Sequence, residues 1–305
     1  MRVQMKNILC ATDFSDFSNH TIPYGVALAK EFDAKLFICH VIDLSSIAIY
    51  GEFQLNPVDQ QNRIRKQAAE QLDQIIGEQP VKWEPLITVG HTADEVSRLV
   101  EEKGIDLVIA ATRGRSGLKR LILGSVTERL MRVLTCPLMV VRSPEHEFVN
   151  PISQEIRLKK ILVGCDFSPD SDLAFQHALS LAQEFEADLH LAHVIEPSVS
   201  SELLKPDKAL SNEIQLGLHQ RFSEKLINMI PEGARNWCTP ETRILEGQPY
   251  EALVKYAETN AMDMIVLGVR GHGLVKTLFL GSTTDRVMRQ SACPVLSVST
   301  KAQSE

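Results

Sequence analysis

The stretch LGVRGHGLVKTLFLGS spans residues 267–282, and a related stretch, AATRGRSGLKRLILGS, spans residues 110–125. Around them, residues 105–142 align with residues 262–299 without a gap, and 15 of the 38 aligned pairs are identical. Two unrelated segments of this length would share far fewer residues. The alignment therefore indicates an internal duplication, which has to be recognised before a fold is assigned.

The duplication extends toward the amino terminus of each copy. ILCATDFSDFS (8–18) aligns with ILVGCDFSPDS (161–171), and the same offset of 153 carries FICHVID (37–43) onto HLAHVIE (190–196). The offset then becomes 157, so the second copy has four extra residues in its middle. The segment 143–160 is polar, contains two prolines and is the predicted linker. We therefore expect two domains, residues 1–145 and residues 156–301.

Each copy alternates strand-like apolar runs with segments of helical periodicity. The expected strands are ILCATD, KLFICHVI, WEPLITVG, DLVIAAT and PLMVVR in the first copy, and ILVGCD, DLHLAHVI, ETRILEG, DMIVLGV and PVLSVS in the second. Continuous apolar strands alternating with helices are typical of a parallel sheet covered on both faces. The sequence thus predicts an α/β protein of two repeated doubly wound, Rossmann-like domains, each with an open, mostly parallel five-stranded sheet flanked by helices.

The bulk composition excludes several classes of protein. The net charge of −7 argues against binding to nucleic acid or to an anionic membrane surface. No apolar run reaches the roughly 20 residues of a membrane helix, and the start of the chain lacks the layout of a signal peptide. The six cysteines form no C-x-x-C pair, which favours buried, reduced thiols over a metal site. We expect a cytoplasmic protein without a metal site.

In an open parallel sheet, ligands bind beyond the carboxyl ends of the strands, where the strand order reverses. Two loops of each copy qualify: the one after the first strand, which begins at Asp13 or Asp166, and the glycine loop after the fourth. If the first and fourth strands are neighbours, both loops line one crevice. The two aspartates would then face a ligand in that crevice, or would simply cap the helix that follows.

The glycine loop of the second copy has features of a phosphate site. Gly268 and Gly271 would let the backbone approach a ligand closely and would permit positive φ angles. Gly281 and Ser282 precede a helix, whose free N–H groups and partial positive charge suit a phosphate. Arg270 or Lys276 would add a full charge. The loop has no Walker A or G-x-G-x-x-G pattern, and the alternative is a tight connection from strand to helix.

The start of that helix has a counterpart in the first copy. Ser282 is followed three residues later by Asp285, and Ser125 by Glu128. Both pairs fit the capping-box pattern, in which the serine is the N-cap. His40 and His193 also share one position in the two copies, before the valine near the end of the second strand. We interpret these histidines as structural hydrogen-bonding residues rather than ligand contacts.

The spacing G-x2-G-x9-G-S resembles that of the universal stress protein family. The resemblance covers nearly the whole chain and includes the Asp-Phe-Ser and His-Val-Ile segments, Gly-Gln-Pro at 247–249 and the closing Gly-Ser…Cys-Pro-Val run. It identifies the chain as a tandem protein with two fused domains of this kind. For the family it implies adenine nucleotide binding, with ATP as the ligand; ADP or AMP, and an accompanying Mg²⁺, stay open.

Carried over residue by residue, the resemblance gives one complete site and one incomplete site. In the second copy the nucleotide-binding residues would be Asp166, Val194, Gly268, Arg270, Gly271, Gly281, Ser282 and Thr283. In the first copy they would be Asp13, Val41, Arg113, Gly114, Gly124 and Ser125, but Ala111 stands where the second copy has Gly268. Whether the first copy binds a nucleotide depends on what position 111 requires. Alanine would be unfavourable if the backbone needs a positive φ, or if the ligand needs the space that the methyl group fills. It would be tolerated if neither is required.

Three functions remain open at this point. The first is a cytosolic stress-response module that holds ATP in a regulatory, non-catalytic role, mainly through the second domain. The second is a weak ATPase or phosphotransferase, although no residue near the loop has the character of a catalytic base. The third is an interaction scaffold without a nucleotide. The resemblance also implies an internal pseudo-dimer through the last strands of the two domains, with a homodimer of chains as a further prediction.

Overall fold

The computed structural model describes residues 3–43, 57–112, 123–142, 147–196, 208–271 and 281–300. It divides into two compact units. The amino-terminal unit comprises Gln4–Ser143 and Val149–Ile156, and the carboxyl-terminal unit comprises Arg157–Glu305 with Met1–Val3 and Pro144–Phe148.

The amino-terminal unit contains five parallel strands in the order β3-β2-β1-β4-β5. Its strands are β1 (Asn7–Ala11), β2 (Lys35–Ile42), β3 (Trp83–Val89), β4 (Leu107–Ala111) and β5 (Leu138–Val141). Its helices are α1 (Asp16–Asn19), α2 (Thr21–Glu31), α4 (Pro57–Ile76), α5 (Thr92–Lys103) and α6 (Ser125–Val133). Strand and helix therefore alternate through the unit.

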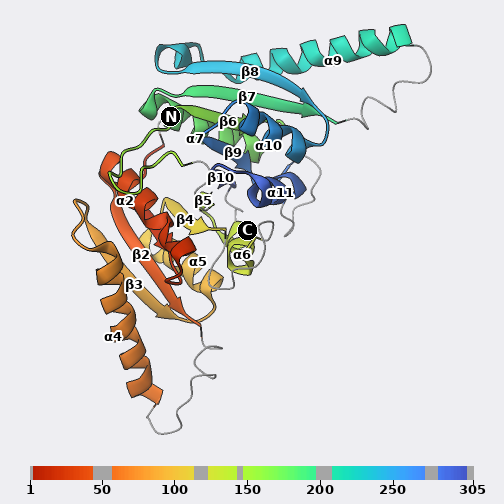
Figure 1. The fold of residues 1–305 in the computed structure, drawn as a ribbon. Coiled ribbons are helices and arrows are strands. Elements are labelled where there is room, and N and C mark those ends of the chain that lie inside the picture. Colours follow the sequence, from red (N-terminus) through yellow and green to blue (C-terminus); the bar gives the residue numbers. More distant parts are fainter. Residues whose placement is uncertain are drawn as a thin grey trace. The chain divides into compact units, whose positions relative to one another are not determined.

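The carboxyl-terminal unit repeats this plan, with the strand order β8-β7-β6-β9-β10 (Figure 1). Its strands are β6 (Lys160–Gly164), β7 (Asp188–Ile195), β8 (Thr239–Glu246), β9 (Met264–Gly268) and β10 (Val295–Val298). Its α-helices are α7 (Pro169–Phe185), α9 (Lys208–Met229), α10 (Pro249–Thr259) and α11 (Ser282–Gln290). A 3-10 helix, Glu232–Asn236, occupies the longer connection between α9 and β8.

The cores of both units are the apolar runs that predicted the strands. All five residues of β4 are buried, and so are the first four of β9. Crossovers between parallel strands are right-handed, so a reversal of strand order puts the helices on both faces of the sheet. In the carboxyl-terminal unit α10 and α11 pack on each other, and α7 contacts β6 and β9. This is the doubly wound α/β fold that the sequence predicts.

The strand order reverses next to the first strand of each unit. In the carboxyl-terminal unit β6 pairs with β9, with Val163 opposite Val266. In the amino-terminal unit β1 pairs with β4, with Cys10 opposite Ile109. The first and fourth strands are therefore neighbours, which is the condition for one crevice. Because the strands are parallel, the loops after them leave the sheet at the same edge.

The first helix differs between the two units. Both copies predict one helix here, and α7 runs unbroken from Pro169 to Phe185. In the amino-terminal unit the helix is divided at His20 into α1 and α2. Pro23, at the position of Gln176, has no backbone N–H to donate to the preceding turn. A helix tolerates proline in its first turn, so a new helix begins at Thr21.

The cysteines are free throughout the chain, and all but Cys136 are buried. Burial raises the pKa values of Cys10 and Cys39 to about 12. Thiols with such pKa values are unreactive near neutral pH. Within the described residues, no helix is long and apolar enough to cross a membrane, and no cluster of three or more His, Cys, Asp or Glu side chains is arranged to hold a metal ion.

Candidate functional site

The Asp-Phe-Ser turn links β6 to α7. Phe167 has a φ of +64°, in the left-handed region that aromatic residues rarely adopt. This conformation lets Oδ1 of Asp166 accept a hydrogen bond from the Ser168 backbone N–H at 3.0 Å. Ser168 is the N-cap of α7, and its hydroxyl accepts from the N–H of Ser171. One carboxylate oxygen of Asp166 therefore shapes the turn, and the serine caps the helix.

The same turn recurs in the amino-terminal unit, where Phe14 has a φ of +66°. Here Oδ1 of Asp13 accepts from the backbone N–H of Ser15 at 3.0 Å and from the hydroxyl of Ser18 at 2.7 Å. The Ser15 hydroxyl donates to it as well, at 2.5 Å. The Asp13 oxygen is thus held by more side chains of its own turn than its counterpart in the carboxyl-terminal unit.

Gly268 ends β9, and its role differs from the one expected. Its φ lies outside the positive region, so no left-handed conformation requires glycine there. A Cβ atom at this position would stand 2.7 Å from the carbonyl carbon of Asp170 and 2.8 Å from the backbone nitrogen of Ser171. The missing side chain therefore makes room for the first turn of α7. The left-handed conformation that Gly268 would permit is not used, and close packing of helix on strand is what excludes a Cβ.

Gly271 and Gly281 bring the two ends of the glycine loop together. Gly271 also has no positive φ; a Cβ atom there would stand 2.6 Å from Oδ2 of Asp166. A Cβ atom at Gly281 would stand 2.9 Å from the carbonyl oxygen of Val269, which accepts a hydrogen bond from the Gly281 N–H. The glycines therefore let the loop lie against the aspartate and close on itself.

The helices after the loops begin one residue earlier than the capping-box pattern predicts. Gly281 and Gly124 are the N-caps of α11 and α6, and neither has a side-chain capping bond. Ser282 and Ser125 are the first helical residues. The acidic members of the two predicted boxes pair with arginines one turn later instead: Asp285 with Arg289 at 2.8 Å and Glu128 with Arg132 at 2.6 Å. The capping-box prediction is wrong because glycine takes the N-cap.

A glycine N-cap leaves the first turn of α11 without a side-chain acceptor. Nearby, the hydroxyl of Thr284 donates to the carbonyl oxygen of Gly268 at 2.7 Å. Thr127 makes the matching bond to Ala111 at 2.8 Å. These bonds fix each helix start against the end of its strand, and sequence analysis missed them. The identity of both threonines between the copies was the signal that could have shown them.

These elements surround a cleft of about 570 Å³ in the carboxyl-terminal unit. The volume lies within the usual range of small-ligand pockets. Every residue predicted for the second site lines it: Asp166, Val194, Gly268, Arg270, Gly271, Gly281, Ser282 and Thr283. The wall also contains His193, Glu196, Pro249 and Leu253, which were not among the predicted site residues.

His193 lines the cleft, and a hydrogen bond determines which of its ring nitrogens carries the proton. Its Nδ1 lies 2.7 Å from the carbonyl oxygen of Cys165, and a carbonyl only accepts, so Nδ1 carries the proton. Its ring lies 4.8 Å from that of Phe167 and 4.2 Å from that of Phe222 on α9. Burial lowers the pKa of His193. His40 makes the same bond to Thr12 at 2.9 Å, so both histidines are hydrogen-bonded to the end of the first strand, as predicted, and His193 lines the cleft as well.

The site predicted in the amino-terminal unit is described only in part. Asp13 and Val41 lie at the carboxyl ends of β1 and β2, and Gly124 and Ser125 begin α6. Arg113 and Gly114 lie outside the described residues. Ala111 is the last residue of β4 and has normal strand pairing with Val141. The backbone at position 111 therefore has an ordinary strand conformation, so this position requires neither a positive φ nor a glycine for its backbone.

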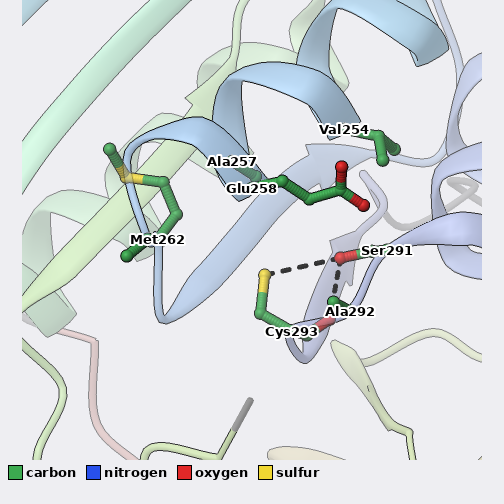
Figure 2. Close-up of a pocket in the computed structure, with 8 residues that line it drawn as sticks. Val254, Ala257, Glu258, Met262, Ser291, Ala292 and Cys293 are labelled. Carbon is green, nitrogen blue, oxygen red and sulfur yellow. Dashed lines mark hydrogen bonds between the residues drawn. The ribbon is translucent and has the colours of Figure 1, made fainter. Parts of the chain in front are cut away.

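A second, smaller cavity of about 200 Å³ lies between α10 and the turn before β10 (Figure 2). In it the Ser291 hydroxyl donates to the carbonyl oxygen of Cys293 at 2.9 Å. Burial raises the pKa of Cys293 to about 11. Met262 and Cys293 precede β9 and β10, so this cavity lies at the amino ends of the strands. It contains none of the predicted site residues.

Comparison with known proteins agrees with this architecture. The sequence model of the universal stress protein family matches twice, over residues 5–142 and 157–299. The universal stress protein Slr1230 of Synechocystis is 25% identical over 313 residues, covering 96% of this chain and 99% of its own. The universal stress protein MJ0531 of Methanocaldococcus jannaschii is 32% identical over 145 residues, covering 47% of this chain and 85% of its own.

Among solved structures, a universal stress protein from Archaeoglobus fulgidus matches with a TM-score of 0.69 and 23% identity, covering 99% of both chains. At 23% identity this match supports the assignment of the fold alone. The doubled family match and the relatives that span one or both copies carry the assignment. The chain belongs to the universal stress protein family and is a tandem member with two such domains.

Proposed function

We propose that the carboxyl-terminal unit binds an adenine nucleotide, ATP above all, in a regulatory and non-catalytic role within the stress response. The observation that carries the proposal is that all eight residues assigned by resemblance converge on one cleft of about 570 Å³. These residues come from three separate segments, at 166, at 194 and at 268–271 with 281–283, which the strand order brings to one edge of the sheet. In this proposal the two domains are residues 1–145 and 156–301.

The cleft has chemistry suited to both ends of a nucleotide. The first turn of α11 presents backbone N–H groups, and the hydroxyl groups of Ser282 and Thr283 stand beside them. Such a helix start favours phosphate. Oδ2 of Asp166 faces Gly271 rather than the turn that Oδ1 shapes, so it is placed to accept from a ribose hydroxyl or a base amine. Val194 would contact the base.

The charges of the cleft favour binding over hydrolysis. Phosphoryl transfer needs a positioned base and usually a metal ion held by carboxylates. Among the described residues, the acidic side chains in the wall are Asp166, which is engaged in its turn, and Glu196. Asp285, on the first turn of α11, is paired with Arg289. In the regulatory role, a bound nucleotide would change the surface around the glycine loop, because it adds a triphosphate and a base there.

The first test is the nucleotide content of the purified protein. The full chain is purified without added nucleotide and denatured, and the adenine nucleotides released per chain are quantified by chromatography, before and after incubation with Mg·ATP. About one equivalent would support a site in the carboxyl-terminal unit alone, and two would mean that Ala111 is tolerated in the amino-terminal unit. No nucleotide in either sample would overturn the proposal and leave the scaffold function.

The non-catalytic part needs a separate measurement. ATP hydrolysis is followed by phosphate release with the protein in excess of ATP, so that even one slow turnover per site is seen. ATP recovered intact long after it has bound supports a regulatory role. Stoichiometric conversion of the bound ATP to ADP over the same time would instead favour the weak ATPase.

A further inference from the structure

Asp170 is a buried carboxylate in the first turn of α7, with a relative exposure of 3%. It lies outside the set of predicted site residues. Its Oδ2 accepts a hydrogen bond from the backbone N–H of Arg270 at 3.0 Å. Its Oδ1 accepts from the backbone N–H of Thr300 at 2.9 Å, and also from the hydroxyl of Thr300. One side chain thus joins a helix, the start of the glycine loop and the segment after β10.

The backbone of Arg270 is held from both sides. While its N–H donates to Asp170, its carbonyl oxygen accepts from the hydroxyl of Ser168 at 3.2 Å. Both partners belong to the start of α7. Residue 270 stands between Gly268, which packs on the first turn of α7, and Gly271, which lies against Asp166. These bonds therefore set where the glycine loop leaves the sheet.

Burying a carboxylate is costly unless donors surround it. Here three donors meet the two oxygens of Asp170, and bonds to an ionised acceptor are stronger than neutral ones. Removing the carboxylate would leave the part-buried N–H groups of Arg270 and Thr300 without this acceptor. The loop and the segment after β10 therefore depend on the same side chain.

The amino-terminal unit has no carboxylate at the repeat position of Asp170. The repeat places Phe17 where the carboxyl-terminal unit has Asp170, and Ser143 where it has Thr300. A phenylalanine cannot accept a hydrogen bond from the loop. The difference between the copies thus extends beyond Ala111: the unit with the complete glycine pattern is also the unit whose loop is tied down by a carboxylate.

We infer that Asp170 is a positioning residue that fixes the glycine loop for the phosphate groups of the ligand and couples the segment at Thr300 to the affinity of that site. The inference rests on the proposed function. It goes beyond it by naming what orders the loop and by predicting that a change at the carboxyl-terminal end of the domain alters nucleotide binding.

The test begins without nucleotide, using Asp170→Asn in the full chain. Amide hydrogen exchange and amide proton shifts of Arg270 and Thr300 are measured by NMR. An asparagine offers one acceptor oxygen and presents an NH₂ group in place of the other, so it cannot serve both amides. We expect exchange at one or both amides to accelerate by about tenfold or more. Unchanged exchange and shifts at both would overturn the inference.

The second arm measures affinity for ATP and for adenosine, which has no phosphate. Asp170→Asn should weaken ATP binding by about tenfold and change adenosine binding much less, because the loop serves the phosphates. Equal losses for both ligands would indicate general damage, and unchanged ATP affinity with accelerated exchange would mean that the clamp does not position the site. Either result contradicts the inference.

Two further variants keep the test decisive. Asp172→Asn removes the same charge from an exposed position in the same turn of α7, and it should leave exchange and affinity unchanged. Thr300→Val removes one donor from the carboxylate without altering it, and should weaken ATP binding by about two- to fivefold even if Asp170→Asn does not fold. If the wild-type chain binds no nucleotide, the proposed function fails, while the exchange arm still decides whether the clamp exists.

Discussion

Gly271 and Asp166 lie in direct contact: a Cβ atom at Gly271 would stand 2.6 Å from Oδ2 of the aspartate. The glycine belongs to the loop after β9, and the aspartate belongs to the turn after β6. Because β6 and β9 are neighbours in the sheet, their loops share one edge and form one wall of the cleft. This contact is the point at which the two halves of the predicted site meet.

Gly271→Val should abolish nucleotide binding by the carboxyl-terminal unit while leaving the fold intact. The branched side chain would displace either the Asp166 carboxylate or the loop, and both line the cleft. Titration with a fluorescent ATP analogue and far-ultraviolet circular dichroism would measure the two effects. Gly217→Ala on α9 is the control, since its Cβ would meet open space. Undiminished affinity in Gly271→Val would rule out this loop as the binding element.

Gly268→Ala and Ala111→Gly exchange one position between the two copies. The first should destabilise the carboxyl-terminal unit by about 1–3 kcal/mol, because its methyl group would press on the backbone of α7. It should also weaken ATP binding. Denaturant unfolding and ATP titration of the same samples would check both effects. Equal stability and affinity in variant and wild type would show that helix and strand adjust freely.

Ala111→Gly should strengthen nucleotide binding by the amino-terminal unit if the methyl group blocks the ligand. It should cost about 0.5–1 kcal/mol of stability, because glycine is unfavourable in a strand. The number of ATP molecules bound per chain would be compared with that of the wild type. An unchanged titration would mean that the obstacle lies elsewhere, for example in the missing carboxylate at Phe17.

His177 should make the protein less stable as the pH falls. Burial lowers the pKa of His177 to about 4 from an ordinary 6.5, and among the described residues its Nδ1 has no hydrogen-bond partner. The unfolded chain takes up a proton as the pH falls through about 6.5, and the folded chain does so only near 4. The free energy of unfolding should therefore decrease between these values, by about 3 kcal/mol at most from this residue.

His177→Tyr isolates that contribution, because Tyr24 occupies the same repeat position and is buried. Urea unfolding at pH 7 and at pH 4.5 would be compared for the variant and the wild type. The variant should lose less stability between the two pH values. His190 and His193 also have lowered pKa values and remain in both proteins, so they cancel in the comparison. An identical loss in both proteins would contradict the prediction.

The thiols should be nearly unreactive in the folded protein. Burial holds the pKa values of Cys10 and Cys39 at about 12 and that of Cys293 at about 11, so little thiolate exists at pH 8. Cys136 is the partly exposed thiol and should react first. Counting modified thiols by mass spectrometry should give about one early adduct in the native state and six after unfolding. Rapid modification of Cys10 or Cys39 would contradict the burial of these two thiols.

The sequence predicted the fold class and the site of the second copy better than it predicted local backbone geometry. The duplication and the apolar runs were enough for two parallel sheets, because continuous apolar strands need helices on both faces. The residues carried over to the second copy do line one cleft, Asp166 and Gly271 among them. The N-caps of α6 and α11 and the single first helix of the amino-terminal unit were predicted wrongly, and the choice between a positive φ and a need for room at Gly268 was left open. Each of these depends on where a neighbouring segment lies in space.

The sequence by itself determined the fold class, through repetition and apolar periodicity, and its motifs carried the resemblance that predicted the family and eight of the residues that line the cleft. Only the tertiary structure showed that Gly268 makes room for α7 and that Asp170 holds Arg270 and Thr300 together. The physical reason is the range of the interactions. Burial patterns and turn conformations are encoded by a few neighbouring residues. These contacts instead join positions about a hundred residues apart, so their partners can be identified only once the sheet has brought them together.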